Sequence, residues 1–203
     1  MSSHKEVISL EIVVGISGAS GVGYGIRLLQ VLQGSVVHLV MTDSARKIIE
    51  VETNFSPEDV EDLADHVYAE DDFTAPIASG SYRFDAMVII PCSMKTLAGV
   101  ASGMSDNLIG RSAEICLKDR RRLVIVPRET PLSLIQLKNM VSVTEAGAVV
   151  LPACPAFYSR PQNLEDLFDV LVGRVLDSIG VENNLYPRWK GNAYNGSEQS
   201  GIR

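Results

Sequence analysis

The sequence contains few of the residues on which disulfide frameworks and metal centres depend. Only three cysteines and three histidines occur among its 203 residues. Cys92, Cys116 and Cys154 are far apart and form no Cys-x-x-Cys pair, and the histidines form no cluster. We therefore expect neither a disulfide framework nor a metal site.

Long apolar runs and an excess of basic charge are also missing. No apolar run approaches the roughly 20 residues that span a bilayer. The first 20 residues carry a lysine and then a glutamate before their apolar run, which is unlike a signal peptide. The 18 basic and 25 acidic side chains give a net charge of −7, which argues against a nucleic-acid binder. We predict a cytoplasmic protein without a membrane or nucleic-acid partner.

What the sequence does contain is a regular alternation of two patterns. Five short, almost continuously apolar runs are typical of strands buried on both faces: Glu11–Ile16, Val36–Met41, Ala86–Pro91, Leu123–Pro127 and Ala148–Pro152. Helix-like stretches lie between and after them, at 22–33, 43–52, 57–66, 94–101, 105–119, 131–143 and 163–179. This alternation predicts an α/β fold with a doubly wound, mostly parallel sheet flanked by helices.

The chain shows no internal repeat and no change of composition that would separate two domains. We expect one domain over residues 1–190 and a loose, polar tail over 191–203. Residues 68–85 are rich in Gly, Ser, Pro and Asp, and we interpret them as a long loop. Loops of that length in compact folds are usually functional or mobile.

The first candidate site follows the first predicted strand, at Gly18-Ala19-Ser20-Gly21-Val22-Gly23. Ligands of doubly wound sheets bind beyond the carboxyl ends of the strands, where helix N-termini favour anions. Small residues let the backbone approach a cofactor closely. The spacing is GxxGxG, which is neither the dinucleotide fingerprint nor a P-loop. A tight turn that needs small residues is the alternative interpretation.

A second candidate follows the third predicted strand, at Pro91–Thr96. Ser93 offers a hydroxyl at a helix start, and Lys95 lies in the first turn, where a cation is disfavoured unless an anion binds there. The alternative is that Ser93 only caps the helix and Lys95 is a solvated surface charge.

The third candidate is Arg128-Glu129, directly after the apolar run LVIVP. An arginine at a carboxyl edge can hold phosphate with two hydrogen bonds, and a neighbouring glutamate can carry a proton. A simple salt bridge between the two is the alternative. The arginines at 120–122 precede a strand, and we interpret them as a solvated turn.

Two further features lie near the end of the domain. Leu151–Pro161 is a proline-punctuated segment whose Phe157 and Tyr158 either pack in the core or face a site. Arg174 lies in a largely apolar part of the last helix, so we expect it to have an anionic partner, which could be a carboxylate. Taken together, the loops after four strands bring small residues, hydroxyls and cations to one edge, as a phosphorylated cofactor and a phosphorylated second substrate require.

Seven segments, taken in order, resemble one family. They are GISGASG, HLVMT, ETNF, ASGS, PCSMKTLAGVASGMSDNLI, LKDRRRLVIVPRETPL and LPACPAFYSRP. The chain is similar through them to the UbiX-like flavin prenyltransferases, which include small subunits associated with phenolic-acid decarboxylases. The resemblance extends from about residue 11 to about residue 190.

The resemblance implies a Rossmann-like flavoprotein, commonly assembled as a homododecamer, that needs no metal. Such enzymes join the dimethylallyl group of dimethylallyl monophosphate to reduced FMN and build a fourth ring on the flavin. Prenylated FMN then serves as the cofactor of a separate UbiD-type decarboxylase.

The resemblance also implies roles for individual residues. The expected FMN contacts are Gly18, Ala19, Ser20, Thr42, Ser93, Met94, Lys95, Thr96 and Arg128. The expected contacts of the dimethylallyl phosphate are Lys118, Arg128, Tyr158 and Arg174. Ser20, Glu52 and Glu129 are expected to handle protons, and Lys118 to act with them in catalysis. Family sites form between subunits, so Glu129 and Arg174 are expected to act across an interface. Phe73 stands where some relatives have Trp, and Thr42 where many have Ser.

Three other functions compete with this one. Flavoproteins of similar fold decarboxylate cysteinyl substrates with a catalytic histidine, but we place His38 inside a strand and His66 in a peripheral helix. A non-catalytic FMN-binding subunit of an aromatic-acid decarboxylase is the second alternative. A nicotinamide-dependent dehydrogenase is the third, with Asp43 near the ribose-binding position, although the glycine spacing is wrong for it.

Overall fold

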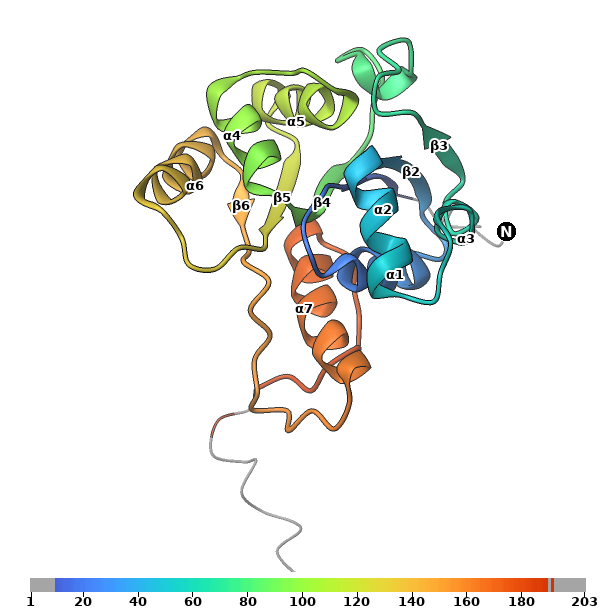
Figure 1. The fold of residues 1–203 in the computed structure, drawn as a ribbon, viewed down its shortest axis with the longest axis vertical. Helices are drawn as coiled ribbons and strands as arrows, with labels where there is room; N and C mark the ends of the chain where they lie inside the picture. The colour runs from blue at the N-terminus through green and yellow to red at the C-terminus, as the bar shows by residue number, and fades with distance from the viewer. Residues whose placement is uncertain (1–9, 190, 192–203) are drawn as a thin grey trace, which may run out of the picture.

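The computed structural model describes residues 10–189 and 191, which form one α/β domain (Figure 1). Its sheet has six strands in the order β3-β2-β1-β4-β5-β6, and every neighbouring pair is parallel. The strands are β1 (Glu11–Ile16), β2 (Val36–Met41), β3 (His66–Tyr68), β4 (Ala86–Cys92), β5 (Arg122–Pro127) and β6 (Val149–Val150). Starting from β1, β2 and β3 are added on one side and β4, β5 and β6 on the other, so the direction of strand addition reverses between β1 and β4. The predicted doubly wound, Rossmann-like fold is therefore confirmed.

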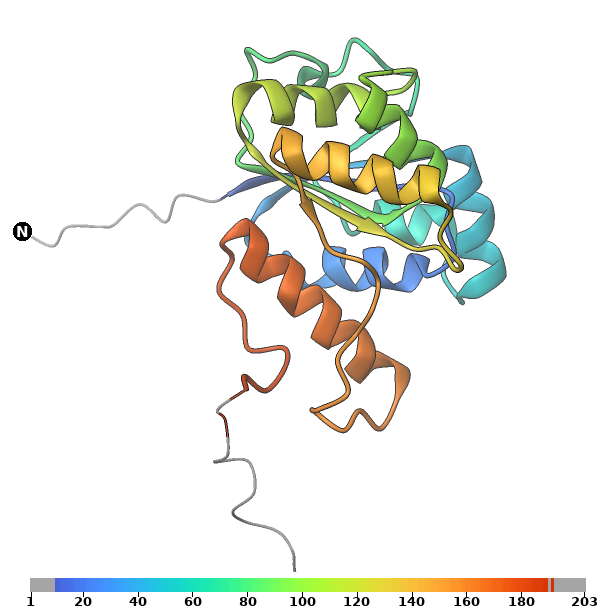
Figure 2. The ribbon, with the colours of Figure 1, turned by 90° about the vertical axis from the view of Figure 1, so that its left-hand side faces the viewer.

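Helices cover both faces of this sheet (Figure 2). One face carries α1 (Val22–Val31), α2 (Asp43–Glu52), α3 (Pro57–Glu61) and α7 (Leu164–Ile179). The other face carries the short 3₁₀ helix η1 (Pro76–Ala78), α4 (Met94–Ser102), α5 (Leu108–Asp119) and α6 (Leu134–Ala146). The central strands have apolar neighbours on both sides, which explains why their sequences are almost continuously apolar.

Alternate residues of each central strand enter two separate cores. Ile12 and Val14 of β1 pack with α1, α2 and α7, whereas Val13 packs with α4 and α5. All three side chains are completely buried. The two cores hold the carboxyl ends of the strands at one edge, where the helices that follow them begin.

The region after α2 differs from the sequence-based prediction. The helix predicted over 57–66 ends at Glu61, and His66 lies in the edge strand β3. His66–Tyr68 leave the helical pattern because they pair with His38–Val40 of β2. A three-residue strand is too short to show a periodicity of its own.

The segment predicted as a long loop over 68–85 packs closely against α5. Ile77 in η1 is completely buried, and its carbonyl accepts a hydrogen bond of 3.1 Å from the Ser112 hydroxyl. Arg121 donates to the Tyr82 carbonyl at 2.8 Å. The Arg121 side chain is only 13% exposed, so the interpretation of residues 120–122 as a solvated turn fails at Arg121, whereas Arg120 and Arg122 are exposed. Arg120 and Arg122 likewise donate to carbonyls, at Ala146 and Ile179.

The predicted tail over 191–203 lies outside the described residues, except for Gly191. The strand predicted over 148–152 is shorter in the structure, since β6 pairs with β5 only at Val149 and Val150. Among the described residues, no helix combines the length and the apolar character needed to cross a membrane.

Candidate functional site

Three helices begin around one cavity at the carboxyl edge of the sheet. Each has a side chain that caps the third backbone N–H of the helix: Thr42 accepts from Ala45 at 3.1 Å, and Ser93 from Thr96 at 3.2 Å. Asn107 does the same for α5 at 3.0 Å. The cavity has a volume of about 610 Å³, within the range of cofactor sites. Converging helix N-termini make it suited to an anionic ligand.

The predicted residues that line this cavity come from four separate motifs. They are Gly18, Thr42, Ser93, Met94, Lys95, Thr96 and Glu129. Lys95 is exposed at the cavity, with its Nζ 3.7 Å from Asp106 Oδ2. The structure thus gathers most of the expected FMN contacts in one place.

The glycine-rich segment is shaped by its contact with α2. A Cβ added to Gly18 would lie 2.5 Å from Cβ of Ser44, so no side chain fits at this position. Gly21 has φ of 95°, a left-handed conformation that favours glycine. The tight turn is therefore confirmed, and it brings Gly18 to the cavity, whereas contact with a cofactor stays a prediction. Ala19 and Ser20 follow Gly18 but do not line the cavity.

Ser17, which was not among the predicted site residues, joins the ends of β1 and β4. It is completely buried, its hydroxyl donates to the Pro91 carbonyl at 3.1 Å, and its oxygen accepts from the Ser93 N–H at 2.8 Å. This pair of hydrogen bonds connects β1 to β4 at the floor of the site.

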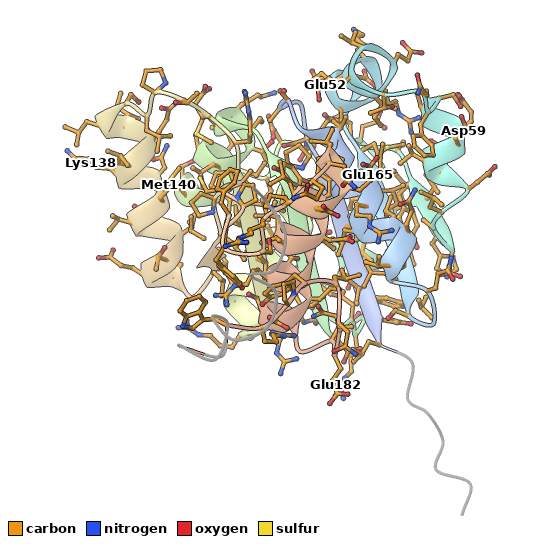
Figure 3. All side chains as sticks on the ribbon, turned by 90° about the horizontal axis from the view of Figure 1, so that it is seen from below. Glu52, Asp59, Lys138, Met140, Glu165 and Glu182 are labelled. Carbon is orange, nitrogen blue, oxygen red and sulfur yellow. The ribbon has the colours of Figure 1, made fainter. Side chains whose placement is uncertain are left out.

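Glu52 and Ser20, both predicted to handle protons, lie close together. One carboxylate oxygen of Glu52 accepts from the Gly21 N–H at 2.7 Å, next to Ser20. Glu52 lies at the end of the molecule opposite Glu182 (Figure 3). The last residue of α2 is thus placed at the start of α1.

Arg128 and Glu129 face different surroundings. Glu129 lines the cavity and accepts from the Thr130 N–H at 2.9 Å. Arg128 does not line it and instead lies near Tyr24 of α1. Burial and the neighbouring Cys154 raise the pKa of Tyr24, and the charge of Arg128 opposes that rise. Among the described residues neither side chain has an ion pair, so the salt-bridge interpretation is not supported.

A second cavity of about 400 Å³ lies between the segment after β6 and α7. Tyr158 and Arg174 line it, together with Cys154 and Tyr186. The Tyr158 hydroxyl donates to the Pro187 carbonyl at 3.2 Å. In the part of the chain that the structure describes, no carboxylate forms an ion pair with Arg174. The carboxylate partner considered for it is therefore absent from these residues.

Lys118 lies apart from both cavities. It is in the last turn of α5, which precedes β5 and therefore lies at the amino edge of the sheet. Its Nζ packs near Gly80. A single chain does not bring Lys118, Arg128 and Arg174 to one point, which sequence order alone could not reveal.

Neither of the two described histidines, His38 and His66, lines either cavity. His38 is buried, and its Nδ1 is 3.0 Å from the Tyr68 hydroxyl. Its ring stacks on that of His66, with centroids 4.8 Å apart. Burial and the neighbouring His66 lower the pKa of His38. The histidine-dependent decarboxylase alternative thus has no histidine at the site among the described residues.

The cysteines are all free thiols, and burial raises the pKa of Cys92 and Cys116 to about 12. Cys154 is exposed. Within residues 10–189 and 191, no group of three or more His, Cys, Asp or Glu side chains is placed to hold a metal ion.

Several polar residues that line the cavity, among them Ser44, Glu70 and Asn107, were not predicted as site residues. Asn107 could have been found, since an asparagine before Leu108-Ile109 is a typical helix cap. Glu70 could not, because it follows β3, which the sequence did not reveal.

Comparisons with known proteins agree with this geometry. The profile of the Flavoprotein family matches residues 1–176. The flavin prenyltransferase UbiX of Thermoplasma acidophilum is 50% identical over 180 residues, which cover 89% of this chain and 100% of that protein.

Two solved structures are similar to this one over almost their whole length. AnUbiX (PadA1), in complex with FMN and dimethylallyl pyrophosphate, has a TM-score of 0.89 and 48% identity, covering 90% of this chain and 98% of its own. A dodecameric FMN-dependent UbiX-like decarboxylase from Escherichia coli O157:H7 has a TM-score of 0.87 and 45% identity, covering 90% and 100%. Fold, cavity and identity over most of its length together show that this chain belongs to the UbiX-like flavin prenyltransferases, within the flavoproteins.

Proposed function

We propose that the protein is a metal-independent flavin prenyltransferase that joins the dimethylallyl group of dimethylallyl monophosphate to reduced FMN. The observation that carries this proposal is the cavity bounded by the starts of α2, α4 and α5. It gathers most of the expected FMN contacts, in a chain that is 50% identical to a flavin prenyltransferase over 89% of its length. That identity favours an enzyme over a non-catalytic accessory subunit.

The cavity suits FMN in charge and in shape. The hydroxyls of Thr42 and Ser93 and the adjacent backbone N–H groups provide donors for the phosphate. Gly18 lines the cavity and lets α2 approach closely, since a Cβ at this position would lie 2.5 Å from Cβ of Ser44. Met94 and Met104 add polarizable apolar surface to the lining. Reduced FMN, when bound, supplies the electron-rich ring that the allyl carbon joins.

The chain's own residues act on the departing phosphate and on protons. When the bond between the allyl carbon and the phosphate oxygen breaks, negative charge grows on the phosphate. Cations held in place stabilise that charge, and we assign this task to Lys118, Arg128 and Arg174, with Tyr158 as a hydrogen-bond donor. We assign proton delivery to the phosphate to Glu129, and proton handling beside the flavin to Ser20 and Glu52.

The distribution of these groups favours a site completed by neighbouring copies of the chain. Lys118 is at the amino edge, and Tyr158 and Arg174 line the second cavity. On the far side of the sheet, α6 buries only Val143 and exposes Leu134 and Ile135 by 67% and 72%. Lys138 and Met140 mark this outer helix in Figure 3. Exposed apolar surface of this kind is typical of an interface, and a homododecamer would bury it.

Prenyl transfer is tested by anaerobic incubation with dithionite-reduced FMN and dimethylallyl monophosphate, followed by mass spectrometry of the released flavin. We expect a flavin heavier by one C5H8 unit. A parallel reaction with the diphosphate compares the two donors. Unmodified FMN from folded, flavin-bound protein would contradict the proposal and favour the accessory subunit.

The shared site is tested by mixing two inactive variants, Lys118→Ala and Arg174→Ala, co-expressed with different tags. If the two residues come from different copies, about a quarter of the sites in a random assembly contain both native residues, so activity returns to that level. No recovery in mixed oligomers would show that each site takes both residues from one chain.

We also propose that prenylated FMN passes to a UbiD-type decarboxylase and that both proteins act in the cytoplasm. Activation of an apo-decarboxylase by the isolated flavin product tests the first point. Cell fractionation tests the second.

A further inference from the structure

Glu70 links two of the helices that surround the flavin cavity. It lies just after β3, and its carboxylate uses both oxygens. Oε1 accepts from the Asp43 N–H at 2.8 Å, and Oε2 accepts from the Asn107 amide at 3.1 Å. Asp43 is the first residue of α2, and Asn107 is the cap of α5. One side chain therefore bridges the starts of both helices.

The backbone of Glu70 strengthens the same connection. Its carbonyl accepts from the Leu108 N–H at 2.7 Å, at the first residue of α5. Asn107 meanwhile accepts from the Gly110 N–H through Oδ1. Because that oxygen caps α5, the amide nitrogen of Asn107 must point toward Glu70. The two positions match as acceptor and donor, and the match depends on a carboxylate at 70 and an amide at 107.

A carboxylate here does not attract the cofactor directly. It lines the same cavity as the hydroxyls of Thr42 and Ser93, where we place the phosphate, and like charges repel. The two hydrogen bonds to the carboxylate and the one to the Glu70 carbonyl give this residue a different task. They fix the separation of α2 and α5 during folding, so that binding does not have to order these helix ends.

We propose that Glu70 is a positioning residue that holds the starts of α2 and α5 at the separation that FMN requires. This inference rests on the proposed function, since FMN is the ligand of that cavity. Glu70 also anchors the segment that carries Phe73, which is 47% exposed three residues further on. The hydrogen bonds from Thr74 to Asp72 hold the turn around Phe73.

The test measures the Kd of oxidised FMN by quenching of flavin fluorescence in the full-length protein, without prenyl donor. Three variants are compared: Glu70→Gln, Asn107→Asp and the double variant.

In Glu70→Gln, the new amide nitrogen faces the amide nitrogen of Asn107, and in Asn107→Asp two carboxylates face each other. We expect each single variant to weaken FMN binding about tenfold. In the double variant, the introduced glutamine donates to one oxygen of the introduced aspartate, and the other oxygen still caps α5. The Kd of FMN should therefore return to within about twofold of wild type.

The Kd values of the three variants distinguish a positioning role of Glu70 from a purely electrostatic effect of its charge on FMN. If Glu70 acts only by its charge, Glu70→Gln tightens FMN binding, Asn107→Asp weakens it, and the double variant shows their sum. That result would overturn the proposal, and so would an unchanged Kd in Glu70→Gln. Glu165→Gln, a matched change in the first turn of α7, serves as control. Unfolding midpoints of all variants distinguish lost affinity from lost stability. If the wild type binds FMN but transfers no prenyl group, the proposed function fails while the Kd pattern still decides the role of Glu70.

Discussion

The two cavities of this protein differ in how much of each a single chain completes. Around the first, Thr42, Ser93, Asn107 and Glu70 are all hydrogen-bonded within the chain. In the second, Arg174 has no carboxylate partner among the described residues, and Lys118 lies at the opposite edge of the sheet. Under the proposed function, we expect folding alone to organise the cofactor half of the site and assembly to complete the donor half.

The largest effect should follow from removing a cation of the donor half. We expect Arg174→Ala to lower kcat/KM for prenyl transfer about 1,000-fold, because the departing phosphate loses a preorganised charge. The Kd of FMN should not change. Arg174→Lys, which keeps the charge without the planar fork, should recover part of the activity. Equal losses of FMN binding and transfer would break the distinction between the two halves.

Glu129 tests the boundary between the halves, since it lines the first cavity but is assigned to the phosphate. We expect Glu129→Gln to lower kcat about 100-fold through loss of proton transfer, with FMN still bound. Single-turnover kinetics and flavin fluorescence measure the two properties separately. Glu182→Gln, at an exposed residue after α7 that lines neither cavity, is the control. Normal turnover in Glu129→Gln would remove this residue from the mechanism.

Gly18 tests the first cavity directly. A Cβ at this position would lie 2.5 Å from Ser44, so we expect Gly18→Ala to push α2 away and to destabilise the fold by about 2 kcal/mol. FMN affinity should fall as well. Gly34→Ala provides the comparison, because Gly34 has φ of 94° but no atom within 4 Å of the added Cβ. That variant should lose about 1 kcal/mol without a change in FMN affinity.

The smallest effect concerns the wall of the second cavity. Asp177 accepts from Arg188 at 2.7 Å and from Tyr186 at 2.8 Å, and Tyr186 lines the cavity. The bonds from Arg188 lower the pKa of Asp177 in the folded state. We expect Asp177→Asn to destabilise the protein by about 1 kcal/mol at pH 7.

The pH dependence of that loss has a definite sign. Because the folded pKa is lowered, the stabilisation is complete above the unfolded value of about 4 and disappears as the pH falls through the folded value. Thermal unfolding of wild type and Asp177→Asn at several pH values should therefore converge in acid. A difference that stays constant down to low pH would assign the effect to packing.

The sequence predicted the central sheet well because each central strand carries its own signal. Glu11–Ile16 and Val36–Met41 match β1 and β2 residue for residue. At the edges, His66–Tyr68 form a strand only by pairing with β2. Because β3 was not predicted, Glu70 was not recognised as a residue that follows the carboxyl end of a strand.

Motif reading found the site residues that lie next to strand ends, such as Thr42 and Ser93. It could not place Lys118, which lies at the far end of a helix that starts at the cavity. Nor could it show that Glu52 contacts Gly21, since 31 residues separate them. Contacts of this kind depend on the angle at which α2 crosses the sheet, which no local pattern records.

The three thiols differ in exposure, which makes the native chain suitable for labelling at one cysteine. Cys92 and Cys116 are buried with their pKa raised to about 12, so they contribute almost no thiolate near neutral pH. Cys154 is exposed and lines the second cavity. A maleimide dye should therefore attach to Cys154 without any engineered substitution. Its rate of attachment and its emission would then report when a neighbouring copy or a phosphorylated donor fills that space.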